Sequence, residues 1–152
     1  MKTTLPMLGA LLLLGVGTLP LAGETVDVEF LSAGPDAPDL PFSEAVRVDD
    51  MLYLSGQIGV APGTMKLVEG GMAAEARQTL DNIKATLERH GSSMGEVVKC
   101  TVMLADMSEW GAFNEVYVTY FEKPFPARSA FGANGLALGG SLELECWATV
   151  AR

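Results

Sequence analysis

The sequence predicts one α+β domain in which short strands alternate with two amphipathic helices. Three observations carry this prediction: a length of 152 residues, a helical hydrophobic repeat over 72–90, and strand-like apolar patterns on both sides of that repeat. A chain of this size can build one hydrophobic core and is short for two. Apolar residues make up 49% of the chain and charged residues 19%, which is typical of a globular protein.

The first part of the chain predicts strands and an irregular arm. A strand is possible at 26–31, and the stretch that follows it, to residue 43, is rich in proline and aspartate. Strands at 45–48 and 51–55 flank Asp49 and Asp50, whose composition is typical of a tight hairpin turn. We therefore expect a hairpin before the first helix.

The first helix is predicted at 72–90 from its hydrophobic spacing. Apolar residues recur there every three or four positions, and charged residues occupy the opposite face. This spacing places the apolar side chains on one stripe of an α-helix. Gly91 ends the run, so His90 is expected to be a residue of the helix C-terminus.

The second half predicts a strand, a shorter helix and two further strands. The strand at 96–104 is followed by Ser108, a suitable N-cap, and by aromatic residues at helical spacing as far as Tyr120. Pro124 and Pro126 end that helix. The remaining elements are strands at 127–134 and 142–151, with a turn at 139–140 between them.

The first 23 residues differ in composition from the rest of the chain. They contain one basic residue, Lys2, a leucine-rich apolar run from 5 to 21, and small residues at Ala22 and Gly23. This pattern is typical of a cleaved secretory signal peptide. An uncleaved membrane anchor is the alternative, and the run is at the lower limit for crossing a bilayer. We expect loss of 1–23, a domain at 24–152, and export to the periplasm or secretion without stable membrane insertion.

The charge of the chain argues against a nucleic-acid partner. Ten Lys and Arg face nineteen Asp and Glu, for a net charge of −9, and removal of Lys2 would leave −10. Proteins gain affinity for phosphates by clustering basic side chains, and few are present here. An anionic small molecule would have to be held by local groups, since the field of the whole protein repels it.

The two cysteines, Cys100 and Cys146, both lie within apolar runs. We expect buried free thiols, because buried cysteine behaves as a small hydrophobe. A disulfide between neighbouring strands is the alternative, and export would permit it. His90 is the only histidine, so we expect no metal site, since ligands are too few.

A few polar residues within predicted strands are the candidates for a functional site. Known nucleotide-binding, phosphate-binding, serine-hydrolase and zinc-protease motifs do not occur. Arg128 opens a strand, and Glu143 and Glu145 alternate with leucines, so both carboxylates face away from the apolar side. An Arg and a Glu on one sheet face can form a surface ion pair, or can clamp a substrate carboxylate and orient water. The pattern alone leaves both interpretations open.

Six segments of the chain stand in an informative order. They are 54–60 (LSGQIGV), 76–84 (ARQTLDNIK), 97–102 (VVKCTV), 113–117 (FNEVY), 125–129 (FPARS) and 142–145 (LELE). Together they resemble the RidA (YjgF) family of enamine/imine deaminases, over about residues 35–152. Each segment alone is weak evidence for the family, whereas all six in this order are specific for it. The expected signal peptide lies outside this resemblance.

The resemblance implies a chorismate-mutase-like α+β fold, with a mixed sheet packed by two helices. It also implies a homotrimer with sites in clefts between subunits. Arg128 would hold the carboxylate of a 2-imino acid of the 2-iminobutanoate/2-iminopropanoate type, derived from enamines such as 2-aminoacrylate, and Glu143 would position the attacking water. Ser55, Gly56 and Asn114 would line the pocket. The products would be a 2-oxo acid and ammonia, and no metal or organic cofactor is implied.

Two candidate substrate-binding residues depart from the family pattern. Phe42 stands where the family has a tyrosine, so the ring is kept and a hydrogen-bond donor is lost. Ala130 stands where the family often has a cysteine, so a thiol is lost and the backbone N–H is kept. We expect both departures to alter the range of substrates.

Two functions of other classes compete with imine hydrolysis. A trimer that binds or senses small carboxylates without turnover would keep Arg128 for the same contact. A chaperone-like or stress-protective surface protein would not depend on Arg128. Imine hydrolysis is the function that the resemblance favours.

Overall fold

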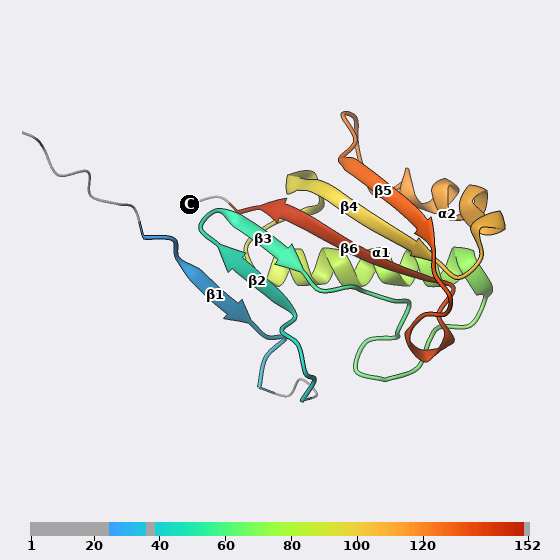
Figure 1. Cartoon of the computed structure of the whole chain (residues 1–152), viewed down its shortest axis with the longest axis horizontal. Helices are drawn as coiled ribbons and strands as arrows, with labels where there is room; N and C mark the ends of the chain where they lie inside the picture. Colours follow the sequence, from blue (N-terminus) through green and yellow to red (C-terminus); the bar gives the residue numbers. More distant parts are fainter. Residues whose placement is uncertain (1–24, 36–38, 151–152) are drawn as a thin grey trace, which may run out of the picture.

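Within the residues that the structure describes, six strands form one sheet in the order β1-β2-β3-β6-β4-β5 (Figure 1). The structure is a computed structural model that describes residues 25–35 and 39–150. Short 3-10 turns precede β4, α2 and β6. The main elements are β1 (Val28–Leu31), β2 (Ala45–Val48), β3 (Met51–Leu54), α1 (Gly71–Arg89), β4 (Val97–Leu104), α2 (Trp110–Tyr117), β5 (Ala127–Gly132) and β6 (Leu142–Thr149).

The sheet is antiparallel except at one edge. β4 and β5 run parallel, whereas β6 lies between β3 and β4 and pairs antiparallel with both. The connection between β4 and β5 contains α2, because two parallel neighbours need a long crossover. The predicted order of strands and helices is confirmed, and with it the α+β class, although β5 ends two residues before the predicted boundary.

One face of the sheet is covered and the other is open. α1 runs behind the sheet in Figure 1 and packs against β6, and α2 packs against α1. Along β6, buried residues alternate with partly exposed ones, as expected for a sheet with one buried face. The buried residues of β6 are Leu142, Leu144, Cys146 and Ala148, which face the helices.

The hairpin and the first helix form as predicted. Val48 pairs with Met51 across the two-residue turn, in which Asp49 has a φ of 50°, a conformation that aspartate tolerates better than most residues. His90 is the C-cap of α1, and Gly91 follows it with a φ of 79°. A residue without a Cβ meets little resistance in that left-handed conformation, so the helix ends there.

Glu44 connects the start of β2 to the end of α1. Its carboxylate lies 2.8 Å from Nε2 of His90 and also accepts hydrogen bonds from Arg89 and Thr86. Burial by itself would raise the pKa of Glu44, but the hydrogen bonds with His90 and Arg89 outweigh burial and lower it. These contacts anchor the chain just after Phe42, one of the candidate site residues.

The second helix differs from the prediction at both ends. Ser108 does not cap α2 but lies in a 3-10 turn, Met107–Glu109, which Asp106 caps by accepting a hydrogen bond of 2.8 Å from the backbone N–H of Ser108. The N-cap of α2 itself is Glu109, whose side chain makes no capping hydrogen bond. A 3-10 turn follows Asp106 before α2 begins. α2 ends at Tyr117, so Tyr120 lies in a turn beyond the helix.

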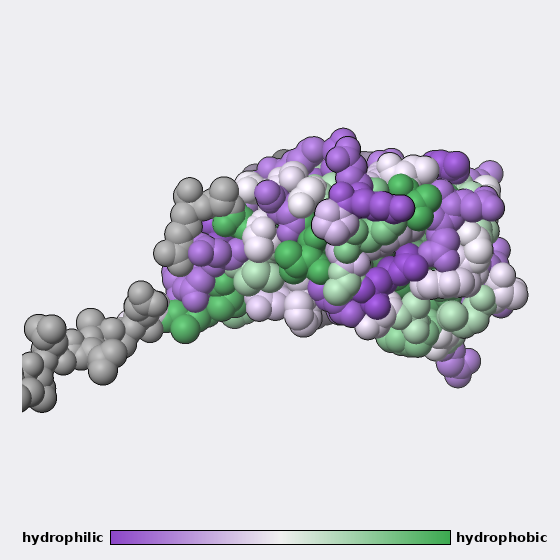
Figure 2. All heavy atoms as spheres, turned by 90° about the horizontal axis from the view of Figure 1, so that it is seen from above, coloured by the Kyte–Doolittle hydropathy of each residue, from purple (hydrophilic) through white to green (hydrophobic). Residues whose placement is uncertain are grey.

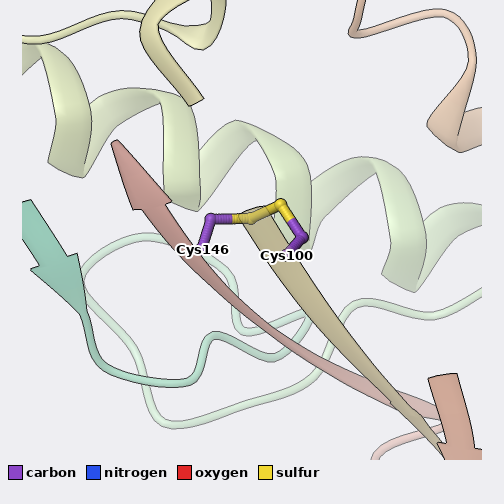
Figure 3. The surroundings of a disulfide bond; sticks show 2 residues. All are labelled: Cys100 and Cys146. Atoms are coloured by element: carbon purple, nitrogen blue, oxygen red, sulfur yellow. A yellow bond between two sulfur atoms is a disulfide. The ribbon is translucent and has the colours of Figure 1, made fainter. Parts of the chain in front are cut away.

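The prediction of two free cysteines is wrong. Cys100 and Cys146 are directly opposed on β4 and β6, with Cα atoms 4.2 Å apart, and they form a disulfide (Figure 3). Both residues are fully buried on the side of the sheet that faces the helices. The apolar pattern predicted their burial, whereas only the pairing of two distant strands brings the sulfur atoms together.

The predicted signal peptide at 1–23 lies outside the described residues. In the part of the chain that the structure describes, no helix is long and apolar enough to cross a membrane.

The disulfide should contribute measurably to stability. It closes a loop with a sequence separation of 46 residues, so the chain-entropy argument gives about 4 kcal/mol at 25 °C. We expect the double variant Cys100→Ala/Cys146→Ala to lose about that much free energy of unfolding and therefore to unfold at a lower denaturant concentration. Wild type that is reduced in denaturant and refolded under reductant is the matched control and should resemble the variant. Equal unfolding midpoints for oxidised and reduced wild type would contradict the bond.

Candidate functional site

Arg128 lies at the start of β5 with its side chain on the helix-covered face. In the parallel pairing of β4 and β5 it is opposite Cys100, whose side chain faces the helices. Its guanidinium carbon lies 4.5 Å from the ring centre of Tyr117, 4.6 Å from that of Trp110 and 5.9 Å from that of Phe113. α2 therefore supplies an aromatic surface on which the guanidinium rests.

The guanidinium of Arg128 keeps its hydrogen-bond donors free. No ion pair or hydrogen bond joins it to another residue within the described ranges. Aromatic ring faces attract a cation through their negative quadrupole and do not need its N–H bonds. The in-plane donors thus remain available to a planar anion such as a carboxylate, which arginine binds through two parallel bonds.

A cavity of about 280 Å³ opens beside this guanidinium. Asn114 of α2 adds an amide to its wall, and the remaining lining is largely apolar or aromatic. Such a cavity is near the lower end of the volumes of small-ligand sites. Its lining consists of Asn114, Tyr117, Val118, Phe125, Pro126 and Arg128.

Glu143 lies on β6 with its side chain on the open face, opposite Met103 of β4. Its carboxylate rests directly against Gly56, where a Cβ would come within 2.8 Å of the carboxyl carbon. Partial burial raises the pKa of Glu143, and the charge of Glu145, two residues along the same face, raises it further. A carboxyl group with a raised pKa is suited to exchange protons nearer to neutral pH.

The segment of Ser55 and Gly56 is fixed beside Glu143 by the backbone. Gln57 exchanges two backbone hydrogen bonds of 2.9 Å with Leu144, the neighbour of Glu143. This short antiparallel bridge holds Gly56 against the carboxylate. The absence of a side chain at Gly56 is what permits the close approach.

Phe42 lies close to Ser55, through a hydrogen bond between Ser55 and the residue after Phe42. The hydroxyl of Ser55 donates a hydrogen bond of 2.7 Å to the carbonyl oxygen of Ser43, which follows Phe42. Phe42, Ser43 and Gln57 line a cavity of about 470 Å³ together with Leu31 and other residues of the arm. The structure thus brings Phe42 close to the segment that contacts Glu143.

The two candidate catalytic side chains leave the sheet on opposite faces. The expectation that Arg128 and Glu143 share one face is wrong, because the register of β5 on β4 places Arg128 with Cys100 on the helix side. One chain therefore supplies two half-sites. We call Arg128, Asn114 and the cavity beside them the Arg128 half-site. The Glu143 half-site consists of Glu143, Gly56, Ser55 and Phe42.

Metal ligands do not gather in either half-site. Across residues 25–35 and 39–150, no group of three or more His, Cys, Asp or Glu side chains could hold a metal ion.

Comparison with known proteins places the chain in a family. The family model described as Endoribonuclease L-PSP matches residues 34–150. A protein of Mus musculus named 2-iminobutanoate/2-iminopropanoate deaminase is 45% identical over 105 residues, which cover 69% of this chain and 78% of that protein. The chain belongs to the RidA (YjgF) family.

Other RidA relatives agree with this assignment. Reactive Intermediate Deaminase A, chloroplastic, of Arabidopsis thaliana is 37% identical over 110 residues, which cover 72% of this chain and 59% of that protein. The crystal structure of RidA from an Antarctic Psychrobacter species matches with a TM-score of 0.71 and 41% identity, over 75% of this chain and 92% of that one. The predicted RidA-like fold is therefore confirmed.

Ala130, the remaining candidate residue, lies near Arg128. It lies on β5 opposite Val102, on the same side of the sheet as Arg128, and it is exposed. Ala130 therefore belongs with the Arg128 half-site. The sequence candidates of this RidA chain thus divide between the two half-sites, and none stands apart from both.

Sequence reasoning missed the role of Trp110. Trp110, Phe113 and Tyr117 are spaced three and four residues apart, so they share one stripe of α2. That spacing was visible in the sequence, but a stripe of aromatic residues normally indicates core packing. Only the position of β5 beside α2 shows that the stripe contacts a cation.

The raised pKa of Glu143 yields a direct test. In Glu145→Gln, the neighbouring negative charge is lost, so ionisation of Glu143 becomes easier and its pKa should fall toward the ordinary value. Carbon-13 NMR titration of the Glu143 carboxyl measures this change. Glu88→Gln, on the outer side of α1 where Glu88 pairs with Lys84, is the control and should leave the titration unchanged. An identical Glu143 titration in Glu145→Gln would show that the charge of Glu145 does not act on it.

Proposed function

We propose that this RidA-family chain hydrolyses reactive enamine and imine intermediates of the 2-iminobutanoate/2-iminopropanoate type to 2-oxo acids and ammonia. The observation that carries the proposal is the guanidinium of Arg128, held against aromatic rings with its hydrogen-bond donors free for a carboxylate. The names of the mouse and Arabidopsis relatives support the same reaction class.

Hydrolysis of an imine depends on positioning more than on a strong nucleophile. The imine carbon is already electrophilic, and protonation of its nitrogen makes it more so. Water forms a C–O bond to that carbon and gives a proton to Glu143. Glu143 returns that proton to the nitrogen, the C–N bond breaks and ammonia leaves. The hydroxyl group formed from water gives its own proton to Glu143 as its oxygen becomes the carbonyl of a 2-oxo acid, and this proton passes on to ammonia or to solvent. Holding substrate and water together can supply much of the rate.

The environment of Glu143 suits this proton transfer. Burial and the charge of Glu145 raise the pKa of Glu143, which makes its carboxylate a better proton acceptor than an ordinary one. The same group can return the proton to the departing nitrogen. Arg128 remains charged at every step and holds the substrate carboxylate without taking part in proton transfer.

Two observations support an assembly with the active site between subunits, which the family resemblance implies to be a homotrimer. Arg128 and Glu143 leave the sheet of one chain on opposite faces, so a small substrate can meet both when the Arg128 half-site of one chain faces the Glu143 half-site of another. The open face also exposes large apolar side chains, including Phe30 and Trp147. Figure 2 shows that apolar residues also reach the surface at several places on the face it views, and Val26 and Val28 are further large apolar residues that are exposed. Association of subunits would bury such a surface.

Phe42 and Ala130 should shift the range of substrates. Phe42 is 58% exposed in the single chain and offers only an apolar ring to a ligand. A substrate with an apolar side chain would lose less binding free energy at Phe42 than a substrate that needs a hydroxyl group as its hydrogen-bond partner. Ala130 leaves more room near Arg128 than a larger side chain would.

Export from the cytoplasm is part of the proposal. The composition of residues 1–23 is that of a secretory signal peptide. The disulfide between Cys100 and Cys146 supports this localisation, since such bonds persist in the periplasm and outside the cell and are rare in the cytosol. The imines would then come from amino-acid oxidation outside the cytoplasm, and a nucleic-acid partner remains unexpected at a net charge of −9.

Arg128→Lys tests the carboxylate anchor. Lysine keeps the charge and loses the planar fork, and a hydrogen bond to a charged group contributes about 1.5–3 kcal/mol, so kcat/KM should fall ~10- to 100-fold. The assay measures ammonia release from freshly generated imino acids, with the oligomeric state of wild type and variant compared by light scattering. If Arg128→Lys releases ammonia at the wild-type rate, Arg128 is not the carboxylate anchor. Binding of 2-oxo acids by an intact trimer that releases no ammonia from any imino acid would replace the deaminase with a carboxylate-binding protein.

Gly56→Ala tests the position of Glu143. The added methyl group would overlap the Glu143 carboxylate and force it to move, so we expect kcat to fall by about 10- to 100-fold with the fold retained. Gly95→Ala is the matched control, because its Cβ would meet the nearest side-chain atom, Oγ of Ser93, at an ordinary 3.6 Å. Steady-state kinetics measures kcat of both variants, and circular dichroism checks that both keep the fold. Equal kcat values for Gly56→Ala and wild type would contradict the role of Glu143.

A further inference from the structure

Three aromatic rings of α2 form a continuous row under Arg128. The ring centres of Trp110 and Phe113 are 5.9 Å apart, and those of Phe113 and Tyr117 are 5.5 Å apart. Tyr117 continues the row to Phe121 at 4.5 Å. The guanidinium of Arg128 therefore rests on a packed array of rings and not on isolated side chains.

The members of this row differ in burial. Phe113 is fully buried and Tyr117 is 3% exposed, so both belong to the hydrophobic core. Trp110 is only partly buried and lies at the first position of α2. It is thus the ring that can be changed with the smallest effect on the core. Trp110 also carries the aromatic system that attracts cations most strongly.

Contact with aromatic rings can fix an arginine without neutralising it, which matters for an anion-binding site in an acidic protein. An acidic side chain beside Arg128 would fix the guanidinium but would occupy two of its donors and neutralise its charge. Contacts with ring faces fix the guanidinium and leave both its charge and its in-plane donors in place. With a net charge of −9, the protein gains no help from its overall field, so a local cation that stays unneutralised is what an anionic ligand requires.

We propose that Trp110 is a positioning residue for Arg128, holding its guanidinium in the orientation that binds a carboxylate. The inference rests on the proposed function in one respect, namely that Arg128 binds the carboxylate of the substrate. Trp110 acts through Arg128 and touches no reacting atom. Its loss should weaken the binding of the substrate and of the transition state alike, which raises KM and leaves kcat nearly unchanged.

Substitution of Trp110 gives the first test. We expect Trp110→Leu to raise KM about 3- to 10-fold, with kcat within about twofold of wild type, since two rings of the row remain. Trp110→Phe keeps a ring and should restore most of the affinity. Tyr120→Phe is the control for lost stability alone, because it removes a hydrogen bond of 2.8 Å to Asp81 beyond the end of α2 and away from Arg128. It should lower the melting temperature and leave KM unchanged.

Tryptophan fluorescence gives the second test, and it does not require turnover. Pyruvate, a stable 2-oxo acid with the carboxylate that Arg128 would bind, is titrated into the full-length protein. A saturable change in emission is expected in wild type, because the anion neutralises the cation that lies 4.6 Å from the Trp110 ring. The change should disappear in Trp110→Phe, which still binds pyruvate by calorimetry, and it should persist in Trp147→Phe. Arg128→Ala should abolish both the emission change and the binding.

The outcomes separate this inference from the proposed function. An unchanged KM in Trp110→Leu, or a KM rise matched by Tyr120→Phe, overturns the positioning role while imine hydrolysis stands. An emission change that remains in Trp110→Phe also overturns it. Pyruvate binding that depends on Arg128 and weakens in Trp110→Leu, in a protein that releases no ammonia from imino acids, supports the positioning role and rejects the deaminase.

Discussion

Strand β6 is paired on both sides, with β3 and with β4, and the alternation of its side chains organises the whole molecule. One set of its residues faces the helices and contributes to the core, including Cys146 and its disulfide to β4. The other set, with Glu143 and Glu145, faces the open side. A shift of this strand by one residue would exchange the two sets and place two carboxylates in the core. The register of β6 is therefore the constraint on which both stability and the candidate chemistry depend.

The disulfide and the arginine share one row across the sheet. Cys146, Cys100 and Arg128 are neighbours on β6, β4 and β5, and all three side chains point toward the helices. The covalent bond fixes β6 to β4. The parallel pairing of β4 with β5 in turn fixes the position of the edge strand that bears Arg128. The guanidinium then meets α2, whose rings hold it without neutralising it. This arrangement explains how a protein with so many acidic groups can keep one cation available to an anion.

The separation of Arg128 from Glu143 has a consequence for assembly. Each chain presents a cation on one face of its sheet and a carboxylate with a raised pKa on the other. In the proposed assembly, a site that uses both groups would be completed when two chains meet. Assembly would then create the proposed activity and also cover the apolar side chains of the open face. The proposed position of the active site between subunits thus follows from the strand register that separates Arg128 from Glu143.

Local features of the fold followed directly from the sequence, because their causes lie within a few residues. The spacing of apolar residues predicted α1, the Asp49-Asp50 pair predicted the hairpin, and alternation with leucines placed Glu143 on the solvent side. The ordered segments indicated the RidA family and hence Arg128 and Glu143 as candidates. Ser108 was predicted to cap α2, whereas it lies within a 3-10 turn that Asp106 caps, because both residue types cap helices and such a turn leaves little trace in the sequence.

The sequence by itself determined which side of β6 faces the core and which class of fold the chain adopts, and it named the candidate residues for chemistry. The tertiary structure decided which of these residues meet. Whether Cys100 reaches Cys146, whether Arg128 shares a face with Glu143, and whether Trp110 contacts a cation all depend on the register of strands that are far apart along the chain. Periodicity sets the direction of a side chain relative to its own strand or helix, but register is set by the packing of the whole sheet against its helices.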